Sequence, residues 1–444
     1  MRRAFAISLL LLVLTAASSR AATLNLTTDR PDGIYRSGEA VRFLATLREG
    51  DKPVVGREIQ YTITGDAGIA VMTGTVTSGE QPAPIILASS KPEFFRCEVS
   101  VKTDETTQPT TASVGAGVEP EKITPAQPPP DDFDAFWSAQ RRLIADHPAT
   151  PTLTPVKSGD DAIEAFDVQI PDGPPGTNVS GYFARPRGAK PRSLPAILYP
   201  HSAGVRDSDL PHAVRGAKLV SGGMLALDLN AHGVPNGRPP EFYTDLLNGA
   251  LADHRVRGMQ DRERVYFRQM YLRVLRALDF LTQQPEWDGQ ILIVEGSSQG
   301  GGQALVAAGL DHRVTLCLAS VPALGDLTAA VVGRESGWPK MLRRAADGSI
   351  DQRAVEALRY VDVAHHASRI RCRTMVSVGF VDRTCPPASV YAAYNSIPAT
   401  TQKSLVARPA MGHAFPKDLI AAWDEVIRVH VRDAQDVRKA ARRG

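Results

Sequence analysis

The segment from Gln290 to Leu310, QILIVEGSSQGGGQALVAAGL, decides the fold of this chain. Its beginning, QILIVEG, is a short run that is apolar on both faces, as is typical of a buried parallel strand, and its end, QALVAAGL, has a helical pattern. The junction matches G-x-S-x-G, which predicts a nucleophile elbow whose strained backbone presents the Ser298 hydroxyl above a sheet. Gly296 and Gly300 have no side chains, and we expect the turn to bring strand and helix close together at these two positions. Nothing in the segment resembles the phosphate-binding pattern G-x-x-x-x-G-K followed by Ser or Thr.

A serine nucleophile needs a base and an orienting carboxylate, and in chains with this elbow they follow in the order acid, then histidine. Asp382 lies in GFVDRTCPP, just after the apolar run RTMVSVGF, and His413 lies in RPAMGHAF, after the short apolar run SLVA. Each therefore sits on a loop after a late strand, at the same edge of the sheet as Ser298. The sequence predicts a triad of Ser298, Asp382 and His413.

Other titratable residues offer competing assignments. His365 and His366, in VAHHAS, are alternative bases, and Asp362 is an alternative acid, but all three precede the strand that leads to Asp382. Four further histidines are expected to line the site or to be structural: His201, His212, His232 and His254. No histidine spacing resembles H-E-x-x-H, so no metal site is predicted.

The predicted reaction is the hydrolysis of an ester through an acyl-enzyme. His413 takes the proton of Ser298 as Ser298 attacks the carbonyl, and Asp382 holds the imidazole tautomer and stabilises the imidazolium. His413 then returns the proton to the leaving alkoxide, and water repeats the cycle on the acyl-enzyme. The chemistry requires no metal or organic cofactor.

The oxyanion of the tetrahedral intermediate needs two backbone donors. One is expected from the N–H of Gln299, the residue after the nucleophile. The other is expected from the loop after the strand PAILYP, which reads His201-Ser202-Ala203-Gly204, so that Ala203 or its neighbour Ser202 is the candidate.

The chain around the elbow alternates strands and helices. PAILYP, MLALDLN and VTLCLASV resemble buried parallel strands, and VYFRQMYLRVLRALDFLTQQ has a helical pattern. Such alternation predicts a doubly wound α/β sheet with right-handed crossovers. Residues 234–260 are rich in turns and charges. The sequence is compatible with two roles for this segment, a lid or an interface.

The N-terminal part has a different character. Residues 23–118 contain short runs rich in β-branched and aromatic residues, such as LNLTT, AVRFLATL and FFRCEVSV, separated by turn clusters. This pattern predicts a small all-β sandwich of immunoglobulin-like architecture, without a Cys-Trp-Cys motif. Residues 119–132, EPEKITPAQPPPDD, form a proline-rich linker, and FDAFWSAQRRLIADHP then opens the α/β domain, residues 133–436, with a helix.

The first 21 residues, MRRAFAISLLLLVLTAASSRA, predict a cleavable secretory signal peptide, and their apolar run is too short to span a membrane. Three of the 51 basic residues of the chain lie there, which leaves 48 basic against 48 acidic residues. A neutral chain argues against nucleic acid and anionic membranes as partners. The four cysteines are scattered, without the spacing of a disulfide framework or a zinc site: Cys97, Cys317, Cys372 and Cys385.

From about residue 128 to 430 the chain resembles the acetyl xylan esterase / cephalosporin C deacetylase family of α/β-hydrolases. The resemblance rests on FDAFW, on the extended block around GSSQGG, and on VDRTCPPASVYAAYNSIP before GHAF. It places the triad on Ser298, Asp382 and His413 and the oxyanion donors on Gln299 and about Ala203. The fold that it implies is an α/β-hydrolase, here preceded by the small sandwich.

This chain departs from the family pattern in three places. Asn230-Ala231-His232-Gly233 stands where the family has an Arg-Gly-Gln segment, Ala414 replaces a glutamate, and Ala203 stands where the family has a tyrosine. We take the candidate pocket residues to be His201, Asn230 and His232. Family members often form ring-like oligomers, but an added domain can block that contact, so a homo-oligomer remains open.

These observations predict a secreted or periplasmic serine esterase that removes acetyl or other small acyl groups from the hydroxyls of oligo- or polysaccharides. Two alternatives belong to other classes. One is a serine peptidase of prolyl-oligopeptidase type, although the chain has no propeller-length β region and no repeat. The other is a non-catalytic glycan-binding protein with a retired hydrolase domain, although all three triad residues are present.

Overall fold

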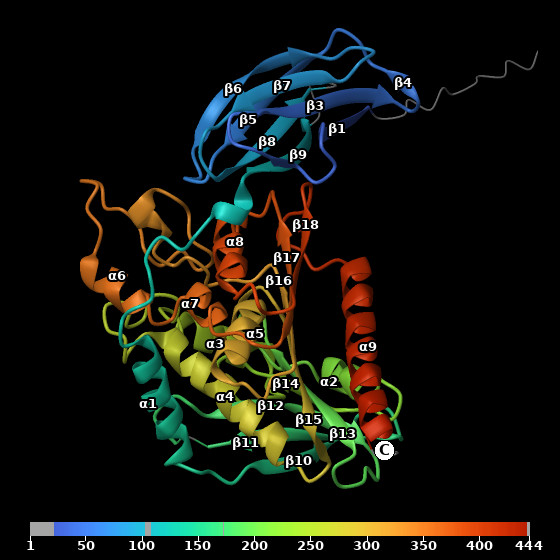
Figure 1. The fold of residues 1–444 in the computed structure, drawn as a ribbon, viewed down its shortest axis with the longest axis vertical. Helices are drawn as coiled ribbons and strands as arrows, with labels where there is room; N and C mark the ends of the chain where they lie inside the picture. The colour runs from blue at the N-terminus through green and yellow to red at the C-terminus, as the bar shows by residue number, and fades with distance from the viewer. Residues whose placement is uncertain (1–21, 103–107, 172, 442–444) are drawn as a thin grey trace, which may run out of the picture.

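The structure, a computed structural model, describes residues 22–102, 108–171 and 173–441. The expected signal peptide, residues 1–21, lies outside the described residues. An all-β region lies above an α/β region that is built around one large sheet (Figure 1). No helix among the described residues is long and apolar enough to cross a membrane.

The all-β region consists of two stacked sheets. In the first, β3 pairs with β1, β4 and β7, and in the second the strand order is β2-β9-β8-β5-β6. Residues from both sheets, such as Phe43, Ile59 and Cys97, are buried between them. The all-β prediction is therefore confirmed, although the pattern of the sequence did not single out β2, β4 or β9. The strands are β1 (Thr23–Thr28), β2 (Ile34–Tyr35), β3 (Ala40–Glu49), β4 (Lys52–Pro53), β5 (Glu58–Thr64), β6 (Ala70–Thr77), β7 (Ala83–Ala88), β8 (Glu93–Val101) and β9 (Thr110–Val118).

The large sheet has the strand order β10-β11-β12-β14-β13-β15-β16-β17-β18. Strands β13 to β18 run parallel to one another, as expected, because helical crossovers connect them. The α/β prediction is confirmed, but the sheet is mixed rather than wholly parallel, because β10, β11 and β12 pair antiparallel at one edge. The strands are β10 (Thr152–Val156), β11 (Ile163–Ile170), β12 (Val179–Pro186), β13 (Leu194–Pro200), β14 (Leu225–Leu229), β15 (Trp287–Ser297), β16 (Leu316–Ser320), β17 (Arg373–Gly379) and β18 (Lys403–Arg408).

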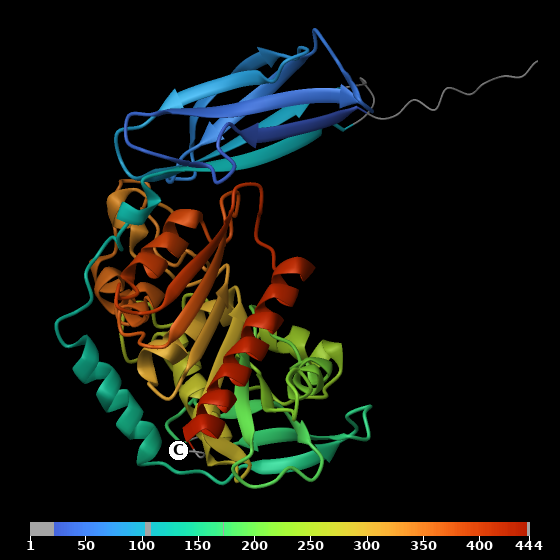
Figure 2. The ribbon, with the colours of Figure 1, turned by 45° about the vertical axis from the view of Figure 1, so that its right-hand side comes forward.

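Helices cover both faces of this sheet (Figures 1 and 2). Residues of α1, α4, α5, α7 and α8 share one apolar cluster, whereas residues of α2 and α9 share another. The expected helices at residues 133 and 265 are α1 and α4. The helices are α1 (Phe133–Ala145), α2 (Leu210–Ala217), α3 (Pro240–Asn248), α4 (Tyr266–Gln283), α5 (Gln299–Leu310), α6 (Gln352–Leu358), α7 (Val363–Ala367), α8 (Pro387–Ser396) and α9 (Lys417–Ala441), with 3₁₀ turns η1 (Pro120–Lys122) and η2 (Ala329–Val332).

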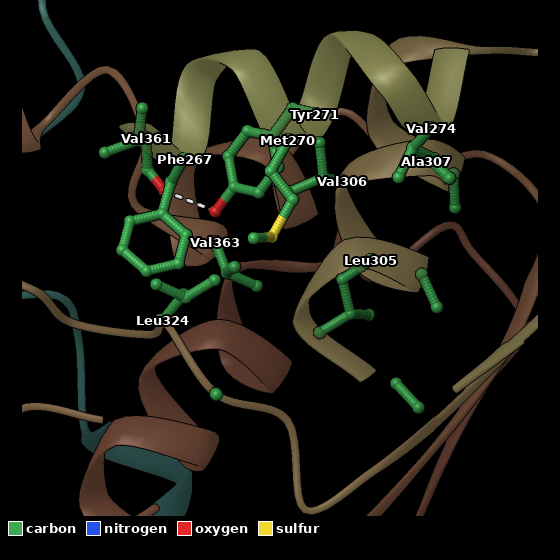
Figure 3. Packing of buried hydrophobic residues seen from close by; sticks show 14 of the residues in the cluster. Phe267, Met270, Tyr271, Val274, Leu305, Val306, Ala307, Leu324, Val361 and Val363 are labelled. Carbon is green, nitrogen blue, oxygen red and sulfur yellow. Dashed lines mark hydrogen bonds between the residues drawn. The ribbon is translucent and has the colours of Figure 1, made fainter. Parts of the chain in front are cut away.

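The helix α5, which begins at the elbow, is held by the main apolar cluster. Side chains of α4, such as Met270 and Val274, lie against Leu305 and Val306 of α5 (Figure 3). The hydroxyl of Tyr271 donates a hydrogen bond of 2.9 Å to the carbonyl oxygen of Val361 in the same cluster. Close packing of this kind fixes the start of α5, and with it the nucleophile that precedes it.

Residues 234–260 include α3 and a series of turns. Tyr243, Leu251 and His254 from this segment are buried against the α/β core. The segment is thus anchored by its own side chains, whichever role it has at the surface.

Candidate active site

Ser298 occupies a strained turn between β15 and α5. Its backbone has φ 57° and ψ −121°, a conformation that is costly for a residue with a side chain. A Cβ at Gly296 would lie 2.3 Å from the carbonyl oxygen of Gly300, and a Cβ at Gly300 would lie 2.2 Å from that of Pro200. The two glycines therefore allow strand, helix and the end of β13 to approach closely, as the elbow pattern predicts.

The structure brings the three predicted residues together. His413 Nε2 lies 2.8 Å from Ser298 Oγ, and His413 Nδ1 lies 2.7 Å from Asp382 Oδ2. Because the Asp382 carboxylate accepts a hydrogen bond from Nδ1–H, the proton stays on Nδ1 and Nε2 is free to accept the hydroxyl proton of Ser298. The other oxygen of Asp382 accepts the backbone N–H groups of Thr384 and Cys385 at 2.8 and 2.9 Å. This is the geometry of an acid, a base and a nucleophile in series.

The loops that carry Asp382 and His413 are bonded to each other. The N–H of Phe380 donates to the carbonyl oxygen of Arg408 at 3.1 Å, and the N–H of Val381 donates to that of Met411 at 3.2 Å. A displacement of one loop is therefore passed to the other.

The competing histidines and the competing acid lie elsewhere. His365 and His366 are buried in α7, where the ring of His366 lies 4.9 Å from that of Trp137. Burial lowers the pKa of His365 to about 3 and that of His366 well below its ordinary value, so both are neutral core residues. Asp362 caps α7 by accepting the N–H of Ala364, and burial raises its pKa to about 7. All three residues are therefore buried parts of the α/β region.

The expected oxyanion donors lie at the start of α5 and in the loop after β13. Gln299 is the first residue of α5, so its N–H has no partner within the helix. Ala203 lies in the loop between β13 and α2, and the Gln303 side chain donates from α5 to the carbonyl oxygen of His201 at the start of that loop, at 3.2 Å. The loop is thus tied to the helix that Ser298 precedes.

Two of the candidate pocket residues are engaged by other protein groups. The Asn230 side chain donates to the carbonyl oxygen of Arg206 at 2.8 Å and accepts the N–H of His232 at 3.0 Å. The His232 ring bonds to the hydroxyl of Tyr266 through Nδ1 at 2.8 Å. Burial, with a further contribution from His254, lowers the pKa of His232 to about 3. Both residues shape the loops after β13 and β14.

The third candidate, His201, lines a cavity of about 390 Å³ beside the elbow. The cavity lies between the ends of β13 and β15 and the beginnings of α2 and α9, and most of the residues that line it have a polar or charged side chain. The lining residues are Tyr199, Pro200, His201, Ser202, Arg206, Asp209, His212, Arg215, Asp228, Glu295, Gly296, Ser297, Phe415 and Ile420.

The cavity contains buried polar groups with unmet hydrogen-bonding capacity. Glu295 is buried at 4% exposure, and its Oε2 has no hydrogen-bond partner, nor has the buried hydroxyl of Tyr199. Burial raises the pKa of Glu295 to about 7. Burial by itself lowers the pKa of His212, but the hydrogen bond of 2.9 Å to Asp228, together with the negative charge of Asp228 and nearby carboxylates, raises it overall. Glu295 was not among the residues predicted from the sequence, although its place as the one glutamate in the apolar run QILIVEG was a signal.

One group of side chains among the described residues is close enough to hold a metal ion: Asp382, Cys385 and His413. Asp382 and His413 already bond to each other, and burial, with the nearby charge of Asp382, raises the pKa of the Cys385 thiol well above its ordinary value. A protonated thiol is a poor ligand, so the group is better suited to proton transfer than to metal binding.

Comparisons with known proteins identify the family of this chain. Residues 119–425 match the family described as acetyl xylan esterase (AXE1). The chain is 31% identical to the acetyl esterase Axe7A of Xylanibacter ruminicola over 83% of this chain and 82% of the relative. The match covers 376 residues, which is more than residues 119–444 contain, so it includes part of the all-β region.

Two solved structures have the same α/β fold. An acetyl xylan esterase from Paenibacillus sp. R4 is 28% identical, with a TM-score of 0.56 over 69% of this chain and 98% of that one. Acetyl xylan esterase 1 from Thermoanaerobacterium sp. JW/SL YS485 has a TM-score of 0.56 at 23% identity, over 69% of this chain and 96% of that one. The second likeness concerns the fold alone.

Proposed function

The chain belongs to the acetyl xylan esterase family and is a carboxylic ester hydrolase, and we propose on this premise that it is a serine esterase that removes acetyl or other small acyl groups from carbohydrate hydroxyls. The observation that carries the proposal is the unbroken series of contacts from Asp382 through His413 to Ser298, at 2.7 and 2.8 Å. In this series each group has the partner that its step requires.

In the proposed mechanism, Ser298 Oγ attacks the ester carbonyl while its proton passes to His413 Nε2. The imidazolium is stabilised by Asp382, which itself stays ionised. The tetrahedral intermediate collapses, the C–O bond to the alcohol breaks, and His413 gives its proton to the leaving alkoxide. Water then attacks the acyl-enzyme by the same route and releases the carboxylic acid and free Ser298.

Backbone donors stabilise the oxyanion in both half-reactions. We assign this role to the N–H of Gln299, where the dipole of α5 adds to the effect, and to the N–H of Ala203. Support comes from the bond between Gln303 and His201, which holds the Ala203 loop beside α5. Removal of one donor of this type typically slows an enzyme by about 10² to 10³.

The cavity beside the elbow is the proposed site for the sugar part of the substrate. It begins at Ser297, next to the nucleophile, and it also includes the start of the loop that holds Ala203. Sugar hydroxyls both donate and accept hydrogen bonds, which suits a cavity whose residues include two polar atoms without a hydrogen-bond partner, Glu295 Oε2 and the Tyr199 hydroxyl. An apolar substrate would leave these groups unsatisfied.

We further propose that the protein is exported, with residues 1–21 as the signal peptide, residues 23–118 as the sandwich domain, residues 119–132 as the linker and residues 133–436 as the esterase domain. Support for export comes from the basic start, apolar run and small-residue end of the first segment. Membership in an esterase family argues against the peptidase alternative, and the intact contact series argues against a retired hydrolase domain.

Acetate release from acetylated xylooligosaccharides tests the proposal, with the wild type compared with Ser298→Ala. We expect the variant to lose at least about 10⁴-fold in kcat. Ser193→Ala, which changes a distant exposed serine, serves as the matched control and should behave as the wild type. Equal rates for wild type and Ser298→Ala would overturn the triad, and cleavage of a prolyl peptide without acetate release would overturn the esterase.

A further inference from the structure

The all-β region contacts the loops that carry the acid and the base. It lies over the carboxyl ends of β17 and β18, the strands that lead to Asp382 and His413 (Figures 1 and 2). We propose that this region positions the acid–base pair, with Phe94 and Gly115 as the residues that hold the two loops in place. The inference rests on the proposed function, because it requires His413 and Asp382 to be the working pair.

Strand β8 presents an outward face to the α/β region. Residues alternate along a strand, so that Phe95 and Cys97 point into the sandwich and Phe94 points away from it. An outward phenylalanine is normally exposed, but Phe94 is only 3% exposed. Its ring centroid lies 4.9 Å from that of Phe380, edge-on, and 5.2 Å from that of Tyr391. Phe94 therefore belongs to the main apolar cluster of the α/β region rather than to the sandwich core.

Strand β9 makes the closest approach, at Gly115. Its N–H donates a hydrogen bond of 2.8 Å to the carbonyl oxygen of Pro409, in the loop that leads to His413. A Cβ at this position would lie 2.4 Å from the Cβ of Phe380 and 2.5 Å from its carbonyl oxygen. Glycine is required here by space, because the backbone of β9 packs directly on the loop of the acid.

These contacts are close to the catalytic side chains along the chain. Phe380 precedes Asp382 by two residues and Pro409 precedes His413 by four, and the two loops are bonded to each other. A shift of β9 would therefore move both partners of the His413–Asp382 bond. A misplacement of 1 Å in an active site can slow catalysis by about 10².

This role is distinct from glycan binding by the sandwich. A positioning element changes the rate of every ester that the triad hydrolyses and leaves the affinity for substrate almost unchanged. A glycan-binding module would instead change KM for the oligosaccharide and leave a small ester such as p-nitrophenyl acetate unaffected.

The test compares Gly115→Ala with Gly79→Ala in the full chain. Gly79 also lies in the all-β region, but the nearest atom to a Cβ there is 3.7 Å away, so Ala fits. We expect Gly115→Ala to lower kcat by about 10-fold to 10²-fold on both p-nitrophenyl acetate and acetylated xylooligosaccharide, with KM within about twofold of the wild type. Gly79→Ala should retain the kcat and KM of the wild type.

The proton NMR signal of the His413–Asp382 hydrogen bond provides a readout that overall stability alone would not move. In Gly115→Ala this downfield signal should shift or broaden, and in Gly79→Ala it should stay in place. A folded Gly115→Ala with the kcat and signal of the wild type would overturn the inference, and so would a change confined to KM for the oligosaccharide.

A second pair of variants decides the question if Gly115→Ala does not fold. Phe94→Ala removes the ring from Phe380, whereas Phe94→Leu keeps an apolar side chain of similar reach. We expect kcat to fall in Phe94→Ala and to recover in large part in Phe94→Leu, and equal kcat for both variants and the wild type would overturn the inference. An active Ser298→Ala would overturn the proposed function itself. An inactive Ser298→Ala, with Gly115→Ala and Phe94→Ala as active as the wild type, would overturn the positioning role alone.

Discussion

The two sides of Ser298 differ in how their polar groups are satisfied. On the side of β17 and β18, Asp382 accepts two backbone N–H groups and the imidazole of His413, and the all-β region packs on the same loops. On the side of β13, the cavity contains Glu295 and Tyr199, which are buried without full hydrogen bonding. A group whose partners all come from the protein is held in one geometry, which suits catalysis. A buried group with unmet capacity suits the recognition of a polar ligand.

The largest effect is expected from a change to the acid on the side of β17 and β18, where the polar groups have hydrogen-bond partners from the protein. Asp382→Asn keeps the size of the side chain but removes the charge that holds the His413 tautomer, so kcat should fall by about 10⁴. The measurement is the steady-state hydrolysis of p-nitrophenyl acetate at neutral pH.

Asp362→Asn is the matched control for this change, because Asp362 was the competing acid in the sequence. Its Oδ1 accepts the N–H groups of Asp326 and Ala364, as an asparagine oxygen still can, whereas its Oδ2 accepts the N–H of Leu327, a bond that an asparagine loses. The lost bond lowers the free energy of unfolding but leaves the contacts of Asp382 in place. We expect kcat within a few-fold of the wild type. A loss of about 10⁴ in Asp362→Asn, with Asp382→Asn active, would reverse the assignment of the acid.

On the unsatisfied side, stability should depend on pH through Glu295. The pKa of this carboxyl is about 7 in the folded protein and 4.5 in its ordinary state, so the folded protein binds the proton more tightly. Its contribution to stability is full below pH 4.5 and is lost as the pH rises through 7, and the difference amounts to about 3 kcal/mol. Glu295→Gln cannot titrate, so the free energy of unfolding of the wild type should fall relative to that of the variant over this range.

Urea unfolding at a series of pH values measures this difference. Glu241→Gln, at an exposed glutamate of α3, should follow the wild type at every pH. Parallel curves for the wild type and Glu295→Gln would contradict the burial of a protonated Glu295.

A smaller effect tests recognition in the same cavity. Glu295→Ala removes a hydrogen-bonding group from the proposed sugar site, so kcat/KM for acetylated xylooligosaccharide should fall about tenfold, or ~1.4 kcal/mol. The value for p-nitrophenyl acetate, which has no sugar, should stay within about twofold. An equal loss on both substrates would mean that Glu295 supports the catalytic geometry instead.

The smallest effect concerns the exposed edge of the contact with the all-β region. Glu98 on β8 forms an ion pair with Arg383, next to Asp382, but the Arg383 side chain is 61% exposed and that of Glu98 38%. Exposed pairs contribute little, so Glu98→Ala should change the free energy of unfolding by about 0.5 kcal/mol or less and kcat by less than about twofold. A loss of kcat like that of Gly115→Ala would show that charge, rather than packing, holds the loop of the acid.

Sequence patterns predicted that Ser298, Asp382 and His413 lie together, and the structure brings their side chains into contact, because each lies at a position that local signals define. Ser298 follows an apolar strand within a glycine-rich turn, and Asp382 and His413 follow the next suitable strands. Strand order in a parallel sheet then places all three at one edge. The resemblance of the extended block around GSSQGG added the family.

The remaining features depend on packing between distant segments. Glu295 is one glutamate in an apolar run, and its cavity forms only where α2 and α9 lie over β13 and β15. The alternation in β8 predicts that Phe94 faces outward, but not that Phe380 covers it. Runs that are apolar on both faces do not predict the antiparallel strands β10 to β12, because β11 alternates buried and partly exposed residues.

The central claim, that Ser298 carries the acyl group during turnover, is tested most directly by rapid acid quenching. Wild-type protein is mixed with p-nitrophenyl acetate, quenched during turnover, digested and analysed by mass spectrometry. The account predicts one acetyl group on the peptide that contains Ser298, and none on that peptide in Ser298→Ala. Full turnover in the wild type with no acetyl group on that peptide at any quench time would contradict it.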